Sequence, residues 1–342
     1  MVYESGKIYE GVTLAQFSTL KVGGKSKYFC VVKSVEELRG ALAESAPRIP
    51  VFILGGGSNI LIPDEGFEGL VIKMGLKGVS YASDEDTVVA KVAAGENWDT
   101  FVSDTVSRGL WGIENLSGIP GTVGGAPIQN IGAYGAEVSS VIESVKIFDL
   151  KTDKEKILSN KECRFSYRDS IFKKPEGKRL IVLEVTFRLS KTPNHNISYK
   201  DLAGFFAEQK TPPTLSEIRS AVLSIRSRKF PDLSLIGTAG SFFKNPIISK
   251  KHFEKLQSQF PNIPSFLAGD SVKVPLAFIL DKICGLKGYA MGNVGLFENQ
   301  PLVLINKGGA TSNEIKVFSK EIKKAVKNKT GIDIEEEVIQ VV

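Results

Sequence analysis

Residues 117–135 constrain the fold more than any other part of this chain. The segment contains six glycines and two prolines but no charged residue. A glycine adopts positive φ and lets another group approach the backbone closely. Flexible linkers are rich in serine and charge, whereas this segment carries Ile119, Val123, Ile128 and Ile131. It therefore predicts a loop whose main-chain amides surround a large, flat, hydrogen-bonding ligand.

A second glycine turn, at residues 55–59, follows the apolar, strand-like run 51–54. Successive N–H groups in such a turn form a concavity that attracts phosphate. An ordinary glycine-rich turn is the alternative. The dinucleotide pattern G-x-G-x-x-G fails at Ile60, and the P-loop pattern before Gly24-Lys25-Ser26 fails at Thr19. The turn thus favours phosphate binding, but neither a Rossmann domain nor a P-loop NTPase.

Composition excludes several classes of protein. The net charge is +6, but the basic residues are spread along the chain and cluster only near the C-terminal helix, without interleaved aromatics, so we expect no nucleic-acid partner. No apolar run approaches the roughly 18–20 residues that span a bilayer, and residues 1–7 do not read as a secretory signal. The isolated thiols Cys30, Cys163 and Cys284 fit a reducing cytoplasm, and we expect no metal site.

The organisation along the chain predicts an α+β protein. Strand-like runs occur at 51–54, 70–74, 88–94, 141–148 and 180–189. A helix is expected at 97–110, and the capping pairs Thr214/Glu217 and Thr311/Glu314 start two more. With 342 residues the chain has room for two or three domains. A break at 210–213 and a return to strand-like sequence after Gly331 suggest the boundaries.

Four side-chain groups suggest chemistry, each with a structural alternative. Arg168 lies among aromatics and hydroxyls, where it would bind a carboxylate, or it forms a surface pair with Asp169. Ser241, between small residues and two phenylalanines, suits a proton donor or a turn serine. The basic helix end 225–232 fits a phosphate or the helix dipole.

The fourth group is the acidic run 335–337 near the C-terminus. In a strand, Glu335 and Glu337 share one face and Glu336 points to the other. Three carboxylates in a strand-like run are costly to bury without partners. The run therefore indicates a site, with a solvated acidic edge as the alternative.

Together these residues resemble the UDP-N-acetylenolpyruvoylglucosamine reductase family (MurB), in the subgroup with a tyrosine in the substrate loop. The matching blocks cover nearly the whole chain in order, at 55–59, 94–98, 114–116, 119–135, 162–172, 240–246 and 302–306. The resemblance implies an α+β fold: a two-subdomain FAD-binding fold of the vanillyl-alcohol-oxidase type plus a C-terminal α+β substrate-binding domain. It places the FAD-binding region at 1–210, split near 80, the substrate-binding domain at 211–330, and a C-terminal strand returning to the active site at 331–342.

The resemblance also implies the reaction: NADPH reduces non-covalently bound FAD, which then reduces UDP-N-acetylglucosamine enolpyruvate to UDP-N-acetylmuramate for peptidoglycan synthesis. Hydride would reach the methylene carbon of the enol ether, and negative charge would develop beside the substrate carboxylate as an enolate. Arg168 and a protonated Glu337 would stabilise this enolate, and Ser241 would protonate the other carbon of the enol ether. Tyr199, Lys229, Asn245 and Gln300 would bind the substrate. FAD would be bound by Gly55, Gly56, Gly57, Ser58, Asn59, Gly95, Ile119, Pro120, Gly121, Thr122, Gly124, Gly125, Gln129, Asn130, Gly132, Ala133, Tyr134 and Gly135.

The tail departs from the family pattern, because Ile339 stands where a basic residue is common. A shift of register would make Glu335 the catalytic acid, and Glu336 is the least favoured. Two rival functions are a flavin oxidase, disfavoured because neither His195 nor His252 lies in a glycine loop, and a non-catalytic nucleotide-binding or nucleic-acid-binding protein. The choice between NADPH and NADH stays open, and we expect a cytoplasmic monomer.

Overall fold

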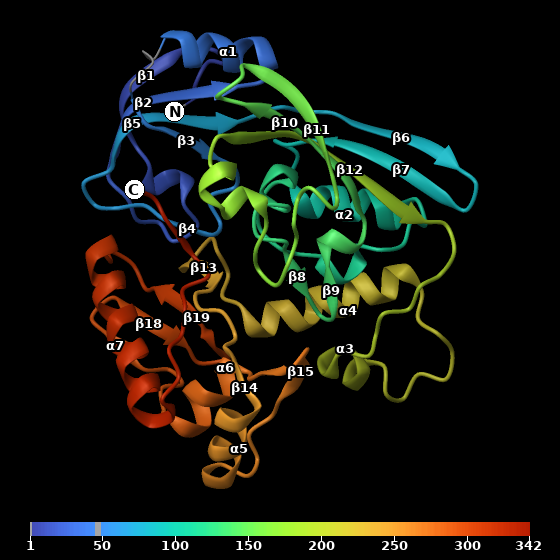
Figure 1. The fold of residues 1–342 in the computed structure, drawn as a ribbon, viewed down its shortest axis with the longest axis vertical. Coiled ribbons are helices and arrows are strands. Elements are labelled where there is room, and N and C mark those ends of the chain that lie inside the picture. Colours follow the sequence, from blue (N-terminus) through green and yellow to red (C-terminus); the bar gives the residue numbers. More distant parts are fainter. Residues whose placement is uncertain (1, 45–48) are drawn as a thin grey trace. The chain divides into compact units, whose positions relative to one another are not determined.

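The computed structural model describes residues 2–44 and 49–342. These residues form two compact units (Figure 1). Unit 1 comprises residues 1–12, 27–56 and 68–226, and unit 2 comprises 13–26, 57–67 and 227–342. Two segments from the first seventy residues therefore belong to the unit that contains the C-terminus. The FAD-binding region and the substrate-binding domain expected from the sequence are defined by the ligands they would bind, so their bounds stay a prediction.

The first sheet of unit 1 has the strand order β1-β2-β5-β3. β3 and β5 run parallel, with Leu54 opposite Lys73, so the turn after β3 lies beside the end of β5. The strand bounds are β1 Ile8–Thr13, β2 Lys25–Val32, β3 Val51–Leu54 and β5 Phe67–Met74. Helix α1 (Val35–Glu44) buries Leu38 and Ala41 in the core of the unit.

The second sheet of unit 1 is antiparallel, in the order β11-β10-β12-β7-β6 (Figure 1). Its strands are β6 Val79–Asp84, β7 Thr87–Ala93, β10 Ile142–Asp149, β11 Lys154–Ser159 and β12 Leu180–Ser190. Helix α2 (Trp98–Ser107) packs Phe101 against Phe187 of β12, with ring centroids 5.0 Å apart. One continuous hydrophobic core joins both sheets of this unit.

Short elements, helix α3 and most of helix α4 complete unit 1. Tyr134, Leu202 and Ile225 belong to a smaller hydrophobic cluster around α4. The bounds are α3 Lys200–Phe205, α4 Leu215–Lys229, β8 Gly132–Ala133, β9 Ala136–Glu137, and the 3₁₀ turns Glu114–Leu116, Val123–Gly125, Val138–Ser140, Ile171–Lys173 and Pro175–Gly177.

Unit 2 is built on the antiparallel sheet β13-β19-β18-β17, with α7 along β18 (Figure 1). A small sheet β14-β16-β15 and the parallel pair β20-β4 accompany it. The strands are β4 Ile60–Leu61, β13 Gly237–Ser241, β14 Ile247–Ser249, β15 Phe266–Ala268, β16 Ser271–Lys273, β17 Ala290–Met291, β18 Val294–Phe297, β19 Gln300–Asn306 and β20 Ile339–Gln340. The helical elements are α5 Lys250–Gln259, α6 Leu276–Phe278 with a π-turn at Ile279–Ile283, α7 Ser312–Thr330, and a 3₁₀ turn at Ala15–Phe17.

The predicted elements agree well with these bounds. All five strand-like runs coincide with strands to within three residues, and Asn97 caps α2. Thr311 and Glu314 form the predicted capping box of α7. The tail is less regular than expected, because β20 has only two residues and Glu336 forms an isolated bridge with Phe243. In the described part of the chain, we find no helix with the length and apolar character needed to cross a bilayer.

Candidate active site

Gly55 and Gly56, the first residues of the short glycine turn, meet the long glycine loop inside unit 1. A Cβ atom built on Gly56 would lie 2.5 Å from Gly121 Cα, and one on Gly55 would lie 2.8 Å from Thr122 Oγ1. Real Cβ atoms essentially never approach a neighbour this closely. Glycine is therefore required at Gly56 for the two backbones to run side by side. Such bare backbone offers N–H groups without side-chain obstruction, which fits a dinucleotide with a diphosphate.

Backbone hydrogen bonds fix the first half of the long loop to the turn after β7. Val123 N donates to Glu96 O over 2.9 Å, and Gly124 N donates to Ala94 O over 2.9 Å. Gly95, between these acceptors, has no room for a Cβ, which would lie 2.6 Å from Leu76 O. Three glycine-containing segments of the predicted cofactor site are thus held together in one unit.

The second half of the loop contains two non-glycine residues with left-handed backbone, Asn130 (φ 46°) and Tyr134 (φ 48°). Such strained positions cluster at functional sites. The Asn130 side chain is committed to the protein: Nδ2 donates to Glu137 Oε2 and Ser166 O, and Oδ1 accepts from Ser139 N. If Asn130 contacts the cofactor, its backbone is the part available to do so.

Arg168 lies next to this loop. Its Nη2 donates to Gly132 O over 2.6 Å, and its guanidinium lies 5.3 Å from the Tyr167 ring centroid. The residue has φ 51°, another left-handed position. Asp169 forms its ion pair with Lys174. These contacts favour a positioned guanidinium over a surface pair between Arg168 and Asp169.

Tyr199, the predicted substrate-loop tyrosine, is the N-cap residue of α3 and has an exposed fraction of 41%. Its ring meets the buried ring of Tyr134 edge-on, with centroids 5.7 Å apart. Burial raises the pKa of the Tyr134 hydroxyl to about 12, so this hydroxyl stays neutral at physiological pH.

Helix α4 contributes residues that sequence reasoning missed. Arg226 Nε donates to Gly118 O over 3.0 Å, and Arg219 makes two hydrogen bonds to the Asp99 carboxylate. Asp99 in turn accepts from Gly118 N over 2.6 Å. The arginines are seven residues apart and share one helix face, but nothing in the local sequence shows that this face supports the glycine-rich loop.

In unit 2, backbone hydrogen bonds place Glu337 beside the strand that ends in Ser241. Glu337 N donates to Phe242 O over 2.8 Å, and Asn59 Nδ2 donates to Glu337 O over 3.2 Å. Asn59 O accepts from Ile339 N over 3.0 Å. The last residue of the 55–59 turn is thus bound to the C-terminal segment that carries the predicted catalytic acid.

The three consecutive acids have different partners. Glu335 is exposed and pairs with Lys244 over 3.0 Å. Glu336 accepts from Ser319 and Lys323 on α7, each over 2.7 Å. Burial would raise the pKa of Glu336, but these hydrogen bonds outweigh burial and lower the pKa below its ordinary value. Glu336 is therefore an ionised anchor to α7.

The remaining substrate candidates also lie in unit 2. Lys229 is the last residue of α4, and Gln300 is the first residue of β19. Asn245 Oδ1 accepts from Leu276 N over 2.9 Å, which leaves its amide N–H groups to donate elsewhere. Arg168 and Tyr199 belong to unit 1, whereas Ser241 and Glu337 belong to unit 2. Their meeting at one substrate stays a prediction.

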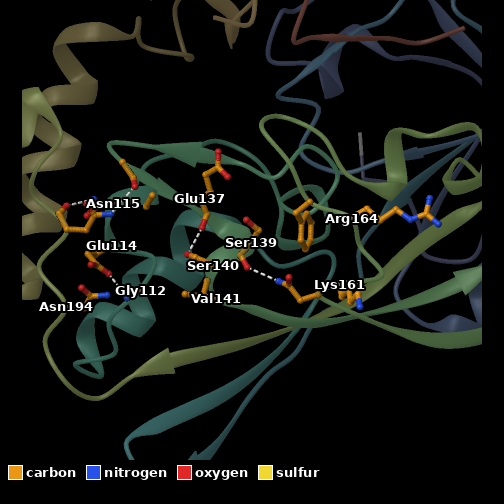
Figure 2. Close-up of a pocket in the computed structure, with 15 residues that line it drawn as sticks. Gly112, Glu114, Asn115, Glu137, Ser139, Ser140, Val141, Lys161, Arg164 and Asn194 are labelled. Carbon is orange, nitrogen blue, oxygen red and sulfur yellow. Dashed lines mark hydrogen bonds between the residues drawn. The ribbon is translucent and has the colours of Figure 1, made fainter. Parts of the chain in front are cut away.

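Unit 1 also contains a polar pocket of about 680 Å³ (Figure 2). Gly135 is the one predicted site residue that lines it. Burial raises the pKa of Glu114, which lines the pocket and accepts from Gly112 N over 2.7 Å. Asn115 Nδ2 donates to Tyr134 O and Asn196 O, while its buried Oδ1 has no partner among the described residues. An ordered water suffices to explain such an atom.

Comparisons with known proteins agree with this geometry. Residues 26–155 match the family described as FAD binding domain. The chain therefore contains an FAD-binding domain. Residues 231–341 match the family described as UDP-N-acetylenolpyruvoylglucosamine reductase, C-terminal domain.

Relatives from several bacteria define the family further. The chain is 42% identical over 287 residues to the UDP-N-acetylenolpyruvoylglucosamine reductase of Porphyromonas gingivalis, covering 83% of this chain and 84% of the relative. It is 40% identical over 337 residues to that of Flavobacterium johnsoniae, covering 97% and 99%. The solved enzyme from Thermus caldophilus superimposes with a TM-score of 0.69 at 24% identity, covering 98% and 99% of the two chains. The chain belongs to the UDP-N-acetylenolpyruvoylglucosamine reductase family.

Proposed function

We propose that the protein reduces UDP-N-acetylglucosamine enolpyruvate to UDP-N-acetylmuramate, with NADPH as donor and non-covalent FAD as cofactor. Family membership supports the reaction. The observation that carries the cofactor assignment is the contact of the glycine loops, where the Gly56 and Gly121 backbones leave no room for a Cβ. FAD, when bound there, supplies hydride-transfer chemistry between NADPH and the enol ether.

The chain's own residues would bind and orient the reactants. The glycine turn at 55–59 would bind the diphosphate of the cofactor, and the loop at 119–135 would line its ribityl chain and ring. Gly132 O and the Tyr167 ring already hold the Arg168 guanidinium in place. A guanidinium fixed before the reaction stabilises negative charge that develops beside a substrate carboxylate at little reorganisation cost.

We assign the proton transfers to unit 2. Ser241 ends β13, and its neighbour Phe242 accepts the backbone hydrogen bond of Glu337. Ser241 would donate the proton to the substrate carbon next to the carboxylate, the carbon opposite the one that receives hydride. Glu337 in its protonated form would assist Arg168. Tyr199, Lys229, Asn245 and Gln300 would bind the UDP-sugar.

A half-reaction experiment tests the proposal. Stopped-flow absorbance would follow the flavin after NADPH alone, and then after the enolpyruvyl sugar is added to the reduced protein. We expect Ser241→Ala to leave flavin reduction intact and to slow reoxidation. The exposed Ser258, whose hydroxyl donates to Lys255 O on α5, provides a Ser→Ala control in the same unit. Equal loss in both half-reactions would assign Ser241 a structural role, and a protein without flavin absorbance would refute the function.

We further propose a cytoplasmic monomer that supports cell shape and division through peptidoglycan precursor synthesis, without a nucleic-acid or membrane partner. The described residues contain no cluster of three metal-ligating side chains. NADH in place of NADPH is the remaining alternative for the donor. Flavin reduction rates with each nicotinamide cofactor distinguish them directly.

A further inference from the structure

A lysine stands beside the first glycine of the diphosphate turn. Lys73 is near the end of β5, opposite Leu54 of the parallel strand β3. Its ammonium group donates to the carbonyl oxygen of Gly55. Because the carboxyl ends of parallel strands meet at one sheet edge, the amine and the turn are brought together by the fold itself.

The surroundings of Lys73 leave its charge uncompensated. Burial, and then the nearby charge of Lys77, lower the pKa of Lys73. Among the described residues, Lys73 pairs with no carboxylate, and a carbonyl oxygen offers only a partial negative charge. A cation that is partly removed from water is stabilised when it is paired with an anion.

We propose that Lys73 binds the diphosphate of FAD. This inference rests on the proposed function, because it takes the 55–59 turn as the diphosphate site. The backbone N–H groups of the turn contribute partial charges, and Lys73 adds a full positive charge on the adjoining strand. A lysine ammonium suits phosphate as a compact point charge with three donors.

Lys77 provides a matched comparison four residues further on. Its ammonium group also donates to a glycine carbonyl, Gly95 O, over 2.6 Å. However, Lys77 is exposed and already pairs with Glu96 over 3.2 Å. Lys77 is therefore neutralised by the protein, whereas Lys73 is not, and only Lys73 is expected to contribute to diphosphate binding.

Flavin titrations of the apoprotein test the proposal. FAD and riboflavin share the ring and ribityl chain, but only FAD carries the diphosphate. We expect Lys73→Met to weaken FAD binding by about tenfold or more, because a hydrogen bond to a charged group is lost. Riboflavin affinity should stay the same, and FAD binding should become less sensitive to salt. Lys73→Arg should restore most of the FAD affinity, and Lys77→Met should bind both flavins as the unaltered protein does.

Four results would overturn the inference. Unchanged FAD affinity in Lys73→Met would mean that the lysine makes no diphosphate contact. Equal weakening of FAD and riboflavin, or failure of Lys73→Arg to restore binding in a folded apoprotein, would give Lys73 a structural role. No FAD binding by the unaltered protein would refute the proposed function, and the Lys73 assignment with it. Thermal melting of each apoprotein distinguishes lost binding from lost folding.

Discussion

Replacing Gly56 by alanine tests how tightly the glycine loops are packed. The backbone of Gly56 does not have positive φ, so alanine is strained only by the lack of space. Its Cβ would lie 2.5 Å from Gly121 Cα, whereas ordinary contact begins at 3.4 Å. The two loops must separate by roughly 0.9 Å, and overpacking of this kind costs about 1–3 kcal/mol. If this cost falls on the FAD-bound state alone, FAD affinity should fall by about 5-fold to 150-fold.

Gly125→Ala is the matched control, because it lies in the same loop and its nearest neighbour, Thr122 Oγ1, would be 3.7 Å from the new Cβ. We expect the free energy of unfolding of the Gly125→Ala apoprotein to stay within about 0.5 kcal/mol of that of the unaltered protein. Urea unfolding of the apoprotein and flavin titration of Gly56→Ala together locate its cost in folding or in binding. A Gly56→Ala protein that matches the unaltered protein in both assays would refute the close approach of the loops.

Other expectations concern single side chains. Glu337→Gln should slow flavin reoxidation by about 10²-fold or more, whereas Glu336→Gln should lower the urea midpoint instead; the reverse order would overturn the register of the tail. Lys229→Ala should raise KM for the UDP-sugar with kcat retained, and an unchanged KM would remove it from the substrate site. Burial would raise the pKa of Asp99, but hydrogen bonds, chiefly from Arg219, lower it below the ordinary 3.8. Asp99 thus stabilises the fold above pH 3.8. The loss in free energy of unfolding that Asp99→Asn shows in urea should therefore shrink as the pH falls below that value.

Local signals in the sequence identify much of this fold. Capping residues such as Thr311 mark helix starts because the pattern lies within one turn of the helix. The strand-like runs are found for the same reason, since alternation and apolar runs are short-range properties. The carboxylate of Glu336 binds Ser319 and Lys323 on α7. The choice between Glu335 and Glu337 as the catalytic acid stays a prediction.

Other features depend on contacts between distant parts of the chain. The pairing of Ile339 with Ile60 has no local signature, and neither does the Asn59 contact with Glu337. The hydrogen bond from Arg226 to the Gly118 carbonyl oxygen joins a helix to a loop more than a hundred residues earlier. A single sequence gives the residue types at these positions, but not which partner each will meet.

The interleaved make-up of unit 2 has a consequence for the order of folding. Leu20, Val22 and Leu61 belong to the same hydrophobic core as Ile315 and Phe318 of α7. A nascent chain must therefore keep its early segments available until the last helix has left the ribosome, and such long-range closure slows folding. A fragment confined to residues 227–342 would expose the apolar surface that those early residues cover. This fragment is therefore a poor choice for separate expression, even though the family match at residues 231–341 covers nearly the same range.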